Sequence, residues 1–273
     1  MGRLTIYGIY RPLQMDNTPF FTIDGNKITL TETLRYLRYA GGFQRFMKDI
    51  LRQYILEKEI ESQQNSEVPY SQITKAIAEF QEQANFKDRN QFSSWMNANG
   101  LTYKEFEEQV AFGIKVEKLK AQIIAEKLEE VFANRKGELD RVVLSRIILK
   151  EQKEADKIQQ KILEDSSNFE LLAREYSITE DRLAGGMMGP VRMGALGEPL
   201  KSAVYQANVG DLIGPVEIEG RYCLFLVGEK LPAVLEGALK QELGNQIFEE
   251  WLQEKLAKLQ VKLEVALQDK VKD

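Results

Sequence analysis

Glycine and proline are distributed unevenly along this chain of 273 residues, and their distribution limits what the chain can fold into. Nine of the nineteen glycines and four of the seven prolines fall between Gly185 and Pro232. Both residues favour turns, glycine because it adopts positive φ angles and proline because its ring fixes φ. We therefore expect a turn-rich segment there, preceded by a long and mostly helical region in which both are sparse.

The first half of the chain predicts one hairpin followed by helices. Asp24-Gly25 lies at the centre of an alternating segment, 20–29, which is typical of a small β-hairpin. Thr31 is expected to cap a short helix that ends at Gly41, and Gly137 is expected to end the last helix of this half. Apolar residues at helical spacing predict four further helices. The first covers about 43–64, the second begins at Ser71, and the third covers about 91–98. The fourth begins at the capping box of Thr102 and continues to about 135.

After Gly137 the pattern changes from helical to mixed. Residues 140–149 form a β-branched apolar run with strand character, and 221–227 form a second one. Helical patterns occupy 151–163, 169–176 and about 235–260, and a strand-like stretch follows at 261–265. The segment between 177 and 220 is expected to be irregular. This order predicts an α+β fold, with a compact core and a helical companion.

Composition excludes several classes of function. The net charge of −5 and the pI near 5.3 give no basic face for nucleic acid. The chain has no histidine and one cysteine, Cys223, which excludes zinc sites, Ser-His or Cys-His catalysis and an internal disulfide. The Gly185–Gly189 run lacks the lysine of a phosphate loop. We therefore expect no metal and no cofactor.

The sequence contains no apolar run of the roughly 20 residues that a membrane-spanning helix requires. Its N-terminus also lacks the apolar core of about 7–15 residues that a secretory signal needs. We therefore expect a cytoplasmic protein without membrane insertion. The sequence predicts no particular oligomeric state.

Specific motifs in the turn-rich segment resemble those of a known family. Gly185-Gly186 with Gly189 resembles the GGDLG turn of parvulin-type (PpiC, or rotamase) peptidyl-prolyl isomerases. Pro199, Ala203, Gly210 and Gly214-Pro215-Val216 match the spacing of later motifs in that family, including its GPV turn. Upstream, FELLAREYS at 169–177 is similar to the family's FxxLAxxYS helix. The resemblance implies a parvulin-like domain.

The flanking segments resemble those of SurA- and PrsA-type foldases, in which the helix after the isomerase domain packs on an N-terminal helical chaperone domain. The resemblance implies a helical N-terminal domain completed by the C-terminal helix, and a small domain with a central antiparallel or mixed sheet. The expected domains are a chaperone domain at 1–137, a parvulin-like domain at 138–232, and a C-terminal helix and strand at 233–273.

The resemblance also implies a substrate site with an apolar floor and a polar rim. Leu196 occupies the family's methionine position, Leu200 its proline-packing phenylalanine position, and Tyr205 that of a second aromatic residue. A purely structural role in the core is the alternative for all three. In the rim, Arg146 and Cys223 replace the two family histidines, and Thr179 or Asp181 occupies the cysteine or aspartate position. We expect Cys223 to be a small buried apolar residue, and we consider an Arg146–Asp181 ion pair in place of the family's network.

Two functions follow from the resemblance. The first is a peptidyl-prolyl cis-trans isomerase and foldase that acts on unfolded or nascent, proline-containing polypeptides, slowed by the loss of both histidines. The second is a catalytically degenerate parvulin that binds client polypeptides without isomerising them. Isomerase activity separates the two.

Overall fold

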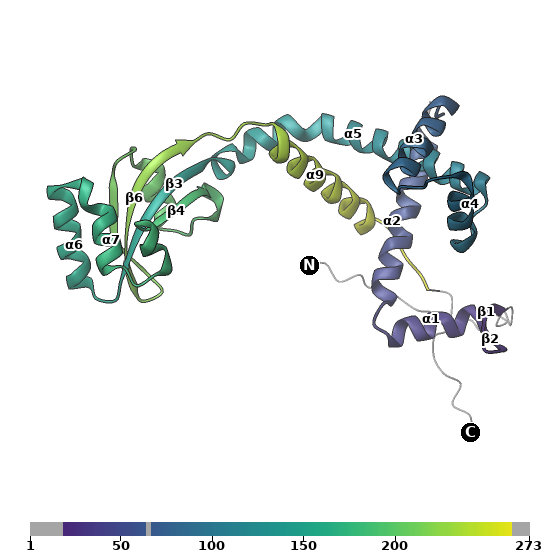
Figure 1. Ribbon diagram of the computed structural model, residues 1–273, viewed down its shortest axis with the longest axis horizontal. Helices are drawn as coiled ribbons and strands as arrows, with labels where there is room; N and C mark the ends of the chain where they lie inside the picture. Colours follow the sequence, from purple (N-terminus) through teal and green to yellow (C-terminus); the bar gives the residue numbers. More distant parts are fainter. Residues whose placement is uncertain (1–18, 64–66, 264–273) are drawn as a thin grey trace, which may run out of the picture. The chain divides into compact units, whose positions relative to one another are not determined.

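The computed structural model describes residues 19–63 and 67–263 and has an α+β fold (Figure 1). The chain divides into two compact units. The N-terminal unit consists of Met1–Glu126 with Gly244–Asp273, and the sheet unit consists of Lys127–Leu243. No helix among the described residues is both long enough and apolar enough to cross a membrane. The cytoplasmic location expected from the sequence stays a prediction.

Helices dominate the N-terminal unit. Its core is a cluster of aromatic and aliphatic side chains, among which the Phe80 and Phe106 rings lie 5.3 Å apart and Phe92 and Trp95 are stacked. Such pairs stabilise a core beyond the area that they bury. The elements are β1 (Pro19–Ile23), β2 (Asn26–Thr29), α1 (Leu30–Tyr39), α2 (Phe43–Ser62), α3 (Tyr70–Gln83), α4 (Arg89–Ala98), the first part of α5 (Tyr103–Leu139) and most of α9 (Gly237–Ala257).

The C-terminal part of α9 packs within the N-terminal unit. A Cβ atom at Gly244 would lie 3.1 Å from Ile124 of α5, so the glycine permits a close approach of these two helices. On α2, Arg52 forms an ion pair with Glu249 at 2.5 Å, and Glu59 forms one with Lys255. These contacts join α9 to two helices that are far from it in sequence.

Two of the expected helix ends are wrong. The N-cap of α1 is Thr29 and not Thr31, because Thr29 has Glu32 three residues later. The Thr29 hydroxyl accepts from the Glu32 N–H at 3.2 Å and the Glu32 carboxylate accepts from the Thr29 N–H at 2.9 Å. Helix α5 continues through Gly137 to Leu139, since a helical glycine costs only about 1 kcal/mol relative to alanine and Leu139 is buried.

The expected strand at 261–265 is absent over 261–263, and the remainder lies outside the described residues. The expected hairpin at 20–29 is confirmed by β1 and β2, which pair antiparallel. The capping box at Thr102 is also confirmed, since its hydroxyl accepts from the Glu105 N–H at 3.2 Å.

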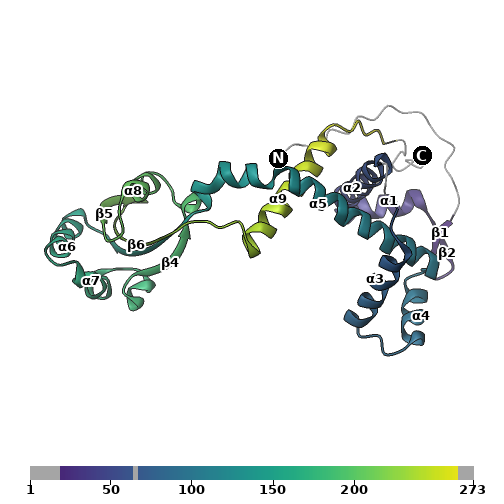
Figure 2. The ribbon, with the colours of Figure 1, turned by 90° about the horizontal axis from the view of Figure 1, so that it is seen from above.

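The sheet unit is built on four antiparallel strands in the order β4-β3-β6-β5 (Figures 1 and 2). The two central strands are those that the sequence predicts. Its elements after the end of α5 are β3 (Arg141–Leu149), α6 (Gln152–Glu164), a 3-10 turn (Ser166–Asn168), α7 (Phe169–Tyr176), a second turn (Glu180–Ala184), β4 (Met187–Arg192), a third turn (Met193–Ala195), α8 (Leu200–Gln206), β5 (Leu212–Ile218), β6 (Arg221–Leu231) and the start of α9.

Alternation along β3 and β6 gives the sheet two buried faces. One face carries Ile147, Leu149 and Leu224 and packs against α6 and α7; we call it the α6/α7 face. The other carries Leu144 and Phe225 and packs against α8 and the third turn; we call it the α8 face. Figure 2 shows α8 apart from α6 and α7 in the same unit.

The segment expected to be irregular contains β4, α8 and β5. These elements have only six, seven and seven residues, and glycines interrupt the strands. Gly214-Pro215-Val216 lies inside β5 rather than in a turn, and the pairing of β5 with β6 shifts register between Ile213 and Val216. The glycines therefore mark strand irregularities as well as turns.

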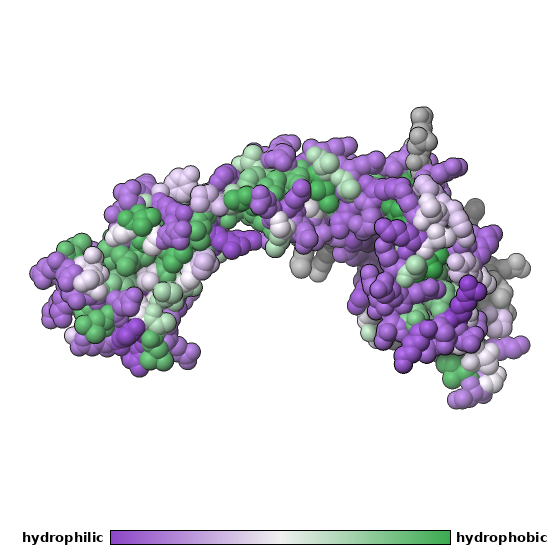
Figure 3. Space-filling model, turned by 45° about the horizontal axis from the view of Figure 1, so that its top comes forward, coloured by the Kyte–Doolittle hydropathy of each residue, from purple (hydrophilic) through white to green (hydrophobic). Residues whose placement is uncertain are grey.

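Apolar residues also lie on the surface of both units. In the space-filling view they appear in green among purple hydrophilic residues (Figure 3). In the sheet unit the exposed ones include Leu163, Leu171 and Leu183. Single exposed apolar side chains are ordinary, so exposure by itself does not mark a binding site.

Candidate functional site

Arg146 is a charged residue in an otherwise apolar row on the α8 face. It lies on β3 between Leu144 and Ile148, and on β6 it pairs with Phe225. Alternation along the strand directs its side chain to the same face as these neighbours. The side chain is 33% exposed, so its guanidinium lies at the edge of the buried cluster and reaches solvent.

The Arg146 guanidinium forms an ion pair with Asp181, and this confirms the pair considered from the sequence. Nε of Arg146 donates to Oδ2 of Asp181 at 2.6 Å. The other carboxylate oxygen of Asp181 accepts from the Thr179 hydroxyl at 2.5 Å. Arginine is always charged, so it donates here at every physiological pH, unlike an imidazole.

A second hydroxyl, that of Ser177, extends this network into the protein. The oxygens of Ser177 and Thr179 lie 3.0 Å apart, and Ser177 accepts from the Ile148 backbone N–H at 3.1 Å. Ser177 is 1% exposed, so its hydroxyl needs these partners. The chain from the β3 backbone through Ser177, Thr179 and Asp181 to Arg146 therefore fixes the direction of the guanidinium.

Gly186 lets the backbone close around the same residues. Its carbonyl accepts from the Arg146 N–H at 2.8 Å, and its own N–H donates to the Asp181 carbonyl at 2.9 Å. Its φ is +78°, and a Cβ there would lie 2.1 Å from the Arg146 carbonyl oxygen. A side chain would meet backbone, so only glycine fits at this contact.

Leu196, Leu200 and Cys223 belong to the apolar cluster on the α8 face. Leu200 is 6% exposed at the start of α8, and Leu196, which is partly buried, packs against the same cluster. Cys223 pairs with Ile148 on β3 and is 3% exposed. Burial raises the pKa of its thiol, although the positive charges of Arg146 and Arg221 act in the opposite direction. The thiol is therefore neutral at pH 7, as expected of a small buried residue.

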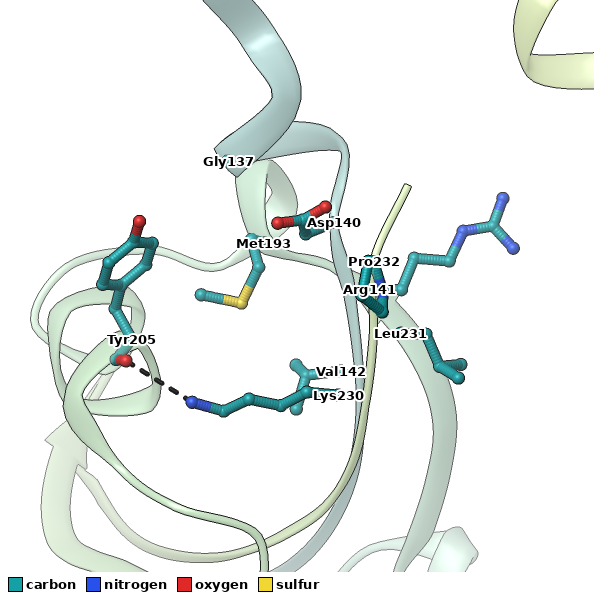
Figure 4. Close-up of a pocket in the computed structure, with 9 residues that line it drawn as sticks. All are labelled: Gly137, Asp140, Arg141, Val142, Met193, Tyr205, Lys230, Leu231 and Pro232. Carbon is teal, nitrogen blue, oxygen red and sulfur yellow. Dashed lines mark hydrogen bonds between the residues drawn. The ribbon is translucent and has the colours of Figure 1, made fainter. Parts of the chain in front are cut away.

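Tyr205 lies apart from the other predicted site residues. It is 68% exposed near the end of α8 and lines a hollow beside Val142 and Met193 (Figure 4). The structure thus brings together Arg146, Thr179, Asp181 and Cys223 with the leucines of the floor, and it places Tyr205 further along the same sheet face. The catalytic and binding roles given to these residues stay predictions.

Sequence reasoning missed Ser177 as a member of the site. Its only signal was its place at the end of the FELLAREYS motif, directly after the amphipathic helix. The expected absence of a metal site also stays a prediction. Among residues 19–63 and 67–263, no three Asp, Glu or Cys side chains gather as a metal site would require.

Comparison with known proteins identifies the sheet unit. Residues 144–229 match the rotamase family, described as the PPIC-type PPIase domain. Foldase protein PrsA 2 of Listeria innocua is 27% identical over 199 residues, which cover 67% of each chain. Foldase protein PrsA 2 of Bacillus cereus is 25% identical over 233 residues, which cover 80% of this chain and 77% of that one. The crystal structure of the peptidylprolyl isomerase PrsA from Bacillus cereus aligns with a TM-score of 0.45, at 20% identity, over 88% of this chain and 86% of that one.

The family match spans both central strands, the network around Arg146 and the apolar floor. The relatives extend the similarity into the N-terminal unit, beyond the matched domain. The chain therefore contains a PPIC-type peptidyl-prolyl isomerase domain of the rotamase family, within a longer sequence related to the PrsA foldases.

Proposed function

We propose that this protein is a foldase whose sheet unit catalyses the cis-trans isomerisation of X–Pro bonds in unfolded polypeptides. One observation carries the proposal. Within the PPIC-type domain, an apolar floor and a fixed cationic donor lie together on the α8 face of the sheet. The relatives named as foldases support a polypeptide as the substrate.

The reaction requires neither a nucleophile nor a metal. An X–Pro bond resists rotation by about 18–20 kcal/mol because the amide loses its resonance as it twists. A catalyst accelerates rotation when it binds the twisted amide more tightly than either planar form. Leu196 and Leu200 supply apolar surface for the prolyl ring, and no covalent bond forms or breaks.

Arg146 supplies the polar part of the site. Its guanidinium is oriented by Asp181 through Nε, which directs the rest of the group toward the edge of the apolar cluster. From there it donates to the carbonyl oxygen of the residue before proline. A donor that is oriented beforehand costs little reorganisation during the reaction.

The alternative function is client binding without isomerisation. It is favoured by the absence of histidine from the whole chain and by the buried, neutral Cys223 at one of the two family histidine positions. The N-terminal unit also has an apolar groove of about 510 Å³ between α3 and α5, lined in part by Val110 and Ile114. Unfolded polypeptide binds such surfaces through its apolar side chains.

A proline-peptide isomerisation assay on the full chain separates the two functions. We expect a rate above the uncatalysed one. Arg146→Ala should lower kcat/KM about tenfold, because it removes one charge-assisted hydrogen bond in the transition state. Lys150→Ala, which removes an exposed charge just after β3, serves as the matched control. A wild-type rate equal to the uncatalysed one, together with suppressed aggregation of a denatured protein, would establish the alternative.

A further inference from the structure

The hollow beside Tyr205 is not used by the proposed reaction. It has a volume of about 250 Å³ and lies where β3 begins and β6 ends. In Figure 4 the Tyr205 ring, the Met193 thioether and the Lys230 side chain surround it, whereas the Arg141 side chain points away. Ligand pockets for small molecules usually measure about 300–1,000 Å³, so the hollow suits a single side chain better than a whole small molecule.

Two of the three charged residues that line the hollow, Asp140 and Lys230, have partners within the protein, and the side chain of the third, Arg141, points away from it (Figure 4). Asp140 accepts from Lys136 at 3.0 Å and from the Ala233 N–H at 2.7 Å. Lys230 donates to the carbonyls of Tyr205 and Ala207 at the end of α8. Because Asp140 and Lys230 are engaged and Arg141 points away, the groups left for a ligand are mainly apolar.

The apolar groups have the character of an aromatic-binding site. Val142 is fully buried beneath the hollow, and Met193 is 6% exposed. Tyr205 presents its ring at the rim with 68% of its surface exposed. A thioether and a tyrosine ring both make favourable contacts with a second aromatic ring.

The hollow continues the surface of the proposed proline site. Both lie on the α8 face and share the same elements: β3 carries Val142 and Arg146, and α8 carries Leu200 and Tyr205. Four residues of strand span about 13 Å and five residues of helix about 8 Å. An extended polypeptide covers these distances with about two to four residues.

We propose that the hollow binds an aromatic side chain of the client polypeptide, two to four residues from the proline that occupies the Leu196–Leu200 floor. The proposal rests on the proposed function for the identity of the ligand. It adds a preference for aromatic residues at a fixed distance from the proline.

A peptide series tests this proposal by fluorescence anisotropy with the full chain. Each labelled peptide contains one proline and one phenylalanine, separated by one to seven residues in either direction, with an alanine peptide as the reference. We expect phenylalanine at a separation of two to four residues, on one side of the proline, to lower Kd about five- to tenfold. The ratio of the Kd of the alanine peptide to that of the phenylalanine peptide measures this preference. Tyr205→Ala and Met193→Ala should each reduce the ratio, and Tyr205→Phe should keep it.

Leu163→Ala is the control variant, because Leu163 is 68% exposed on α6, which packs on the opposite face of the sheet. Circular dichroism confirms that each variant is folded before its binding is measured. The same ratio at every separation, or a ratio unchanged in Tyr205→Ala, would overturn the proposal. Isomerisation is measured separately on the alanine peptide, so the loss of the proposed function and the loss of the aromatic site are told apart.

Discussion

The two faces of the sheet use the same strands for different purposes. On the α6/α7 face, Ile147 and Leu149 of β3 are fully buried among apolar side chains from two helices. On the α8 face, the alternate residues of the same strand include Arg146, which ends a network of hydroxyl and carboxylate groups. Because successive side chains of a strand point to opposite faces, β3 contributes to an apolar core on one side of the sheet and to a polar network on the other.

The largest expected effect is on the α6/α7 face. Ile147→Ala should lower the free energy of unfolding of the sheet unit by about 2–5 kcal/mol, because it removes a fully buried side chain and leaves a cavity. Urea unfolding, followed by circular dichroism, measures the change. Ile178→Ala, at a position 38% exposed, is the control. A loss below about 1 kcal/mol would contradict the assignment of this face as the core.

A smaller effect is expected at the neighbouring residue on the α8 face. Arg146→Ala should lower the free energy of unfolding by about 1–2 kcal/mol, because Asp181 loses a charged partner but keeps the Thr179 hydroxyl. The same urea titration gives this value. The double variant Arg146→Ala/Asp181→Ala should cost less than the sum of the single ones, since neither charge is then left alone. Additive losses would show that the two residues are not coupled in solution.

The comparison of the faces also shows what the sequence could predict. The resemblance of short motifs to the parvulin family placed Arg146, Asp181 and Cys223 in one polar rim, and the structure confirms the ion pair between Arg146 and Asp181. The α+β class followed from the change from helical to mixed patterns after Gly137.

The positions that the sequence did not predict depend on tertiary contacts. The β4 and β5 strands are short, each contains a Gly-Pro pair, and they become strands only by pairing with β3 and β6. Tyr205 belongs to the same short helix as Leu200, yet the helix carries it away from the floor to the hollow at Met193. Motif spacing gives an order along the chain, whereas the direction of α8 over the sheet decides which residues meet.

The smallest expected effect is a loss of stability at alkaline pH that comes from Cys223. This residue belongs to the apolar cluster, although it lies on the same face as Arg146. Because burial raises the pKa of the thiol in the folded state, the unfolded chain releases the proton first as the pH rises above about 8.5. Below that pH the neutral thiol makes its full contribution to the free energy of unfolding. This contribution is lost as the pH rises toward the pKa of the thiol in the folded state. Urea titrations at pH 7 to 10 should therefore show wild type losing more stability than Cys223→Ala, whose other titrating groups are the same. Parallel pH curves for the two proteins would mean that Arg146 and Arg221 cancel the effect of burial, so that the α8 face is more polar around Cys223 than its packing indicates.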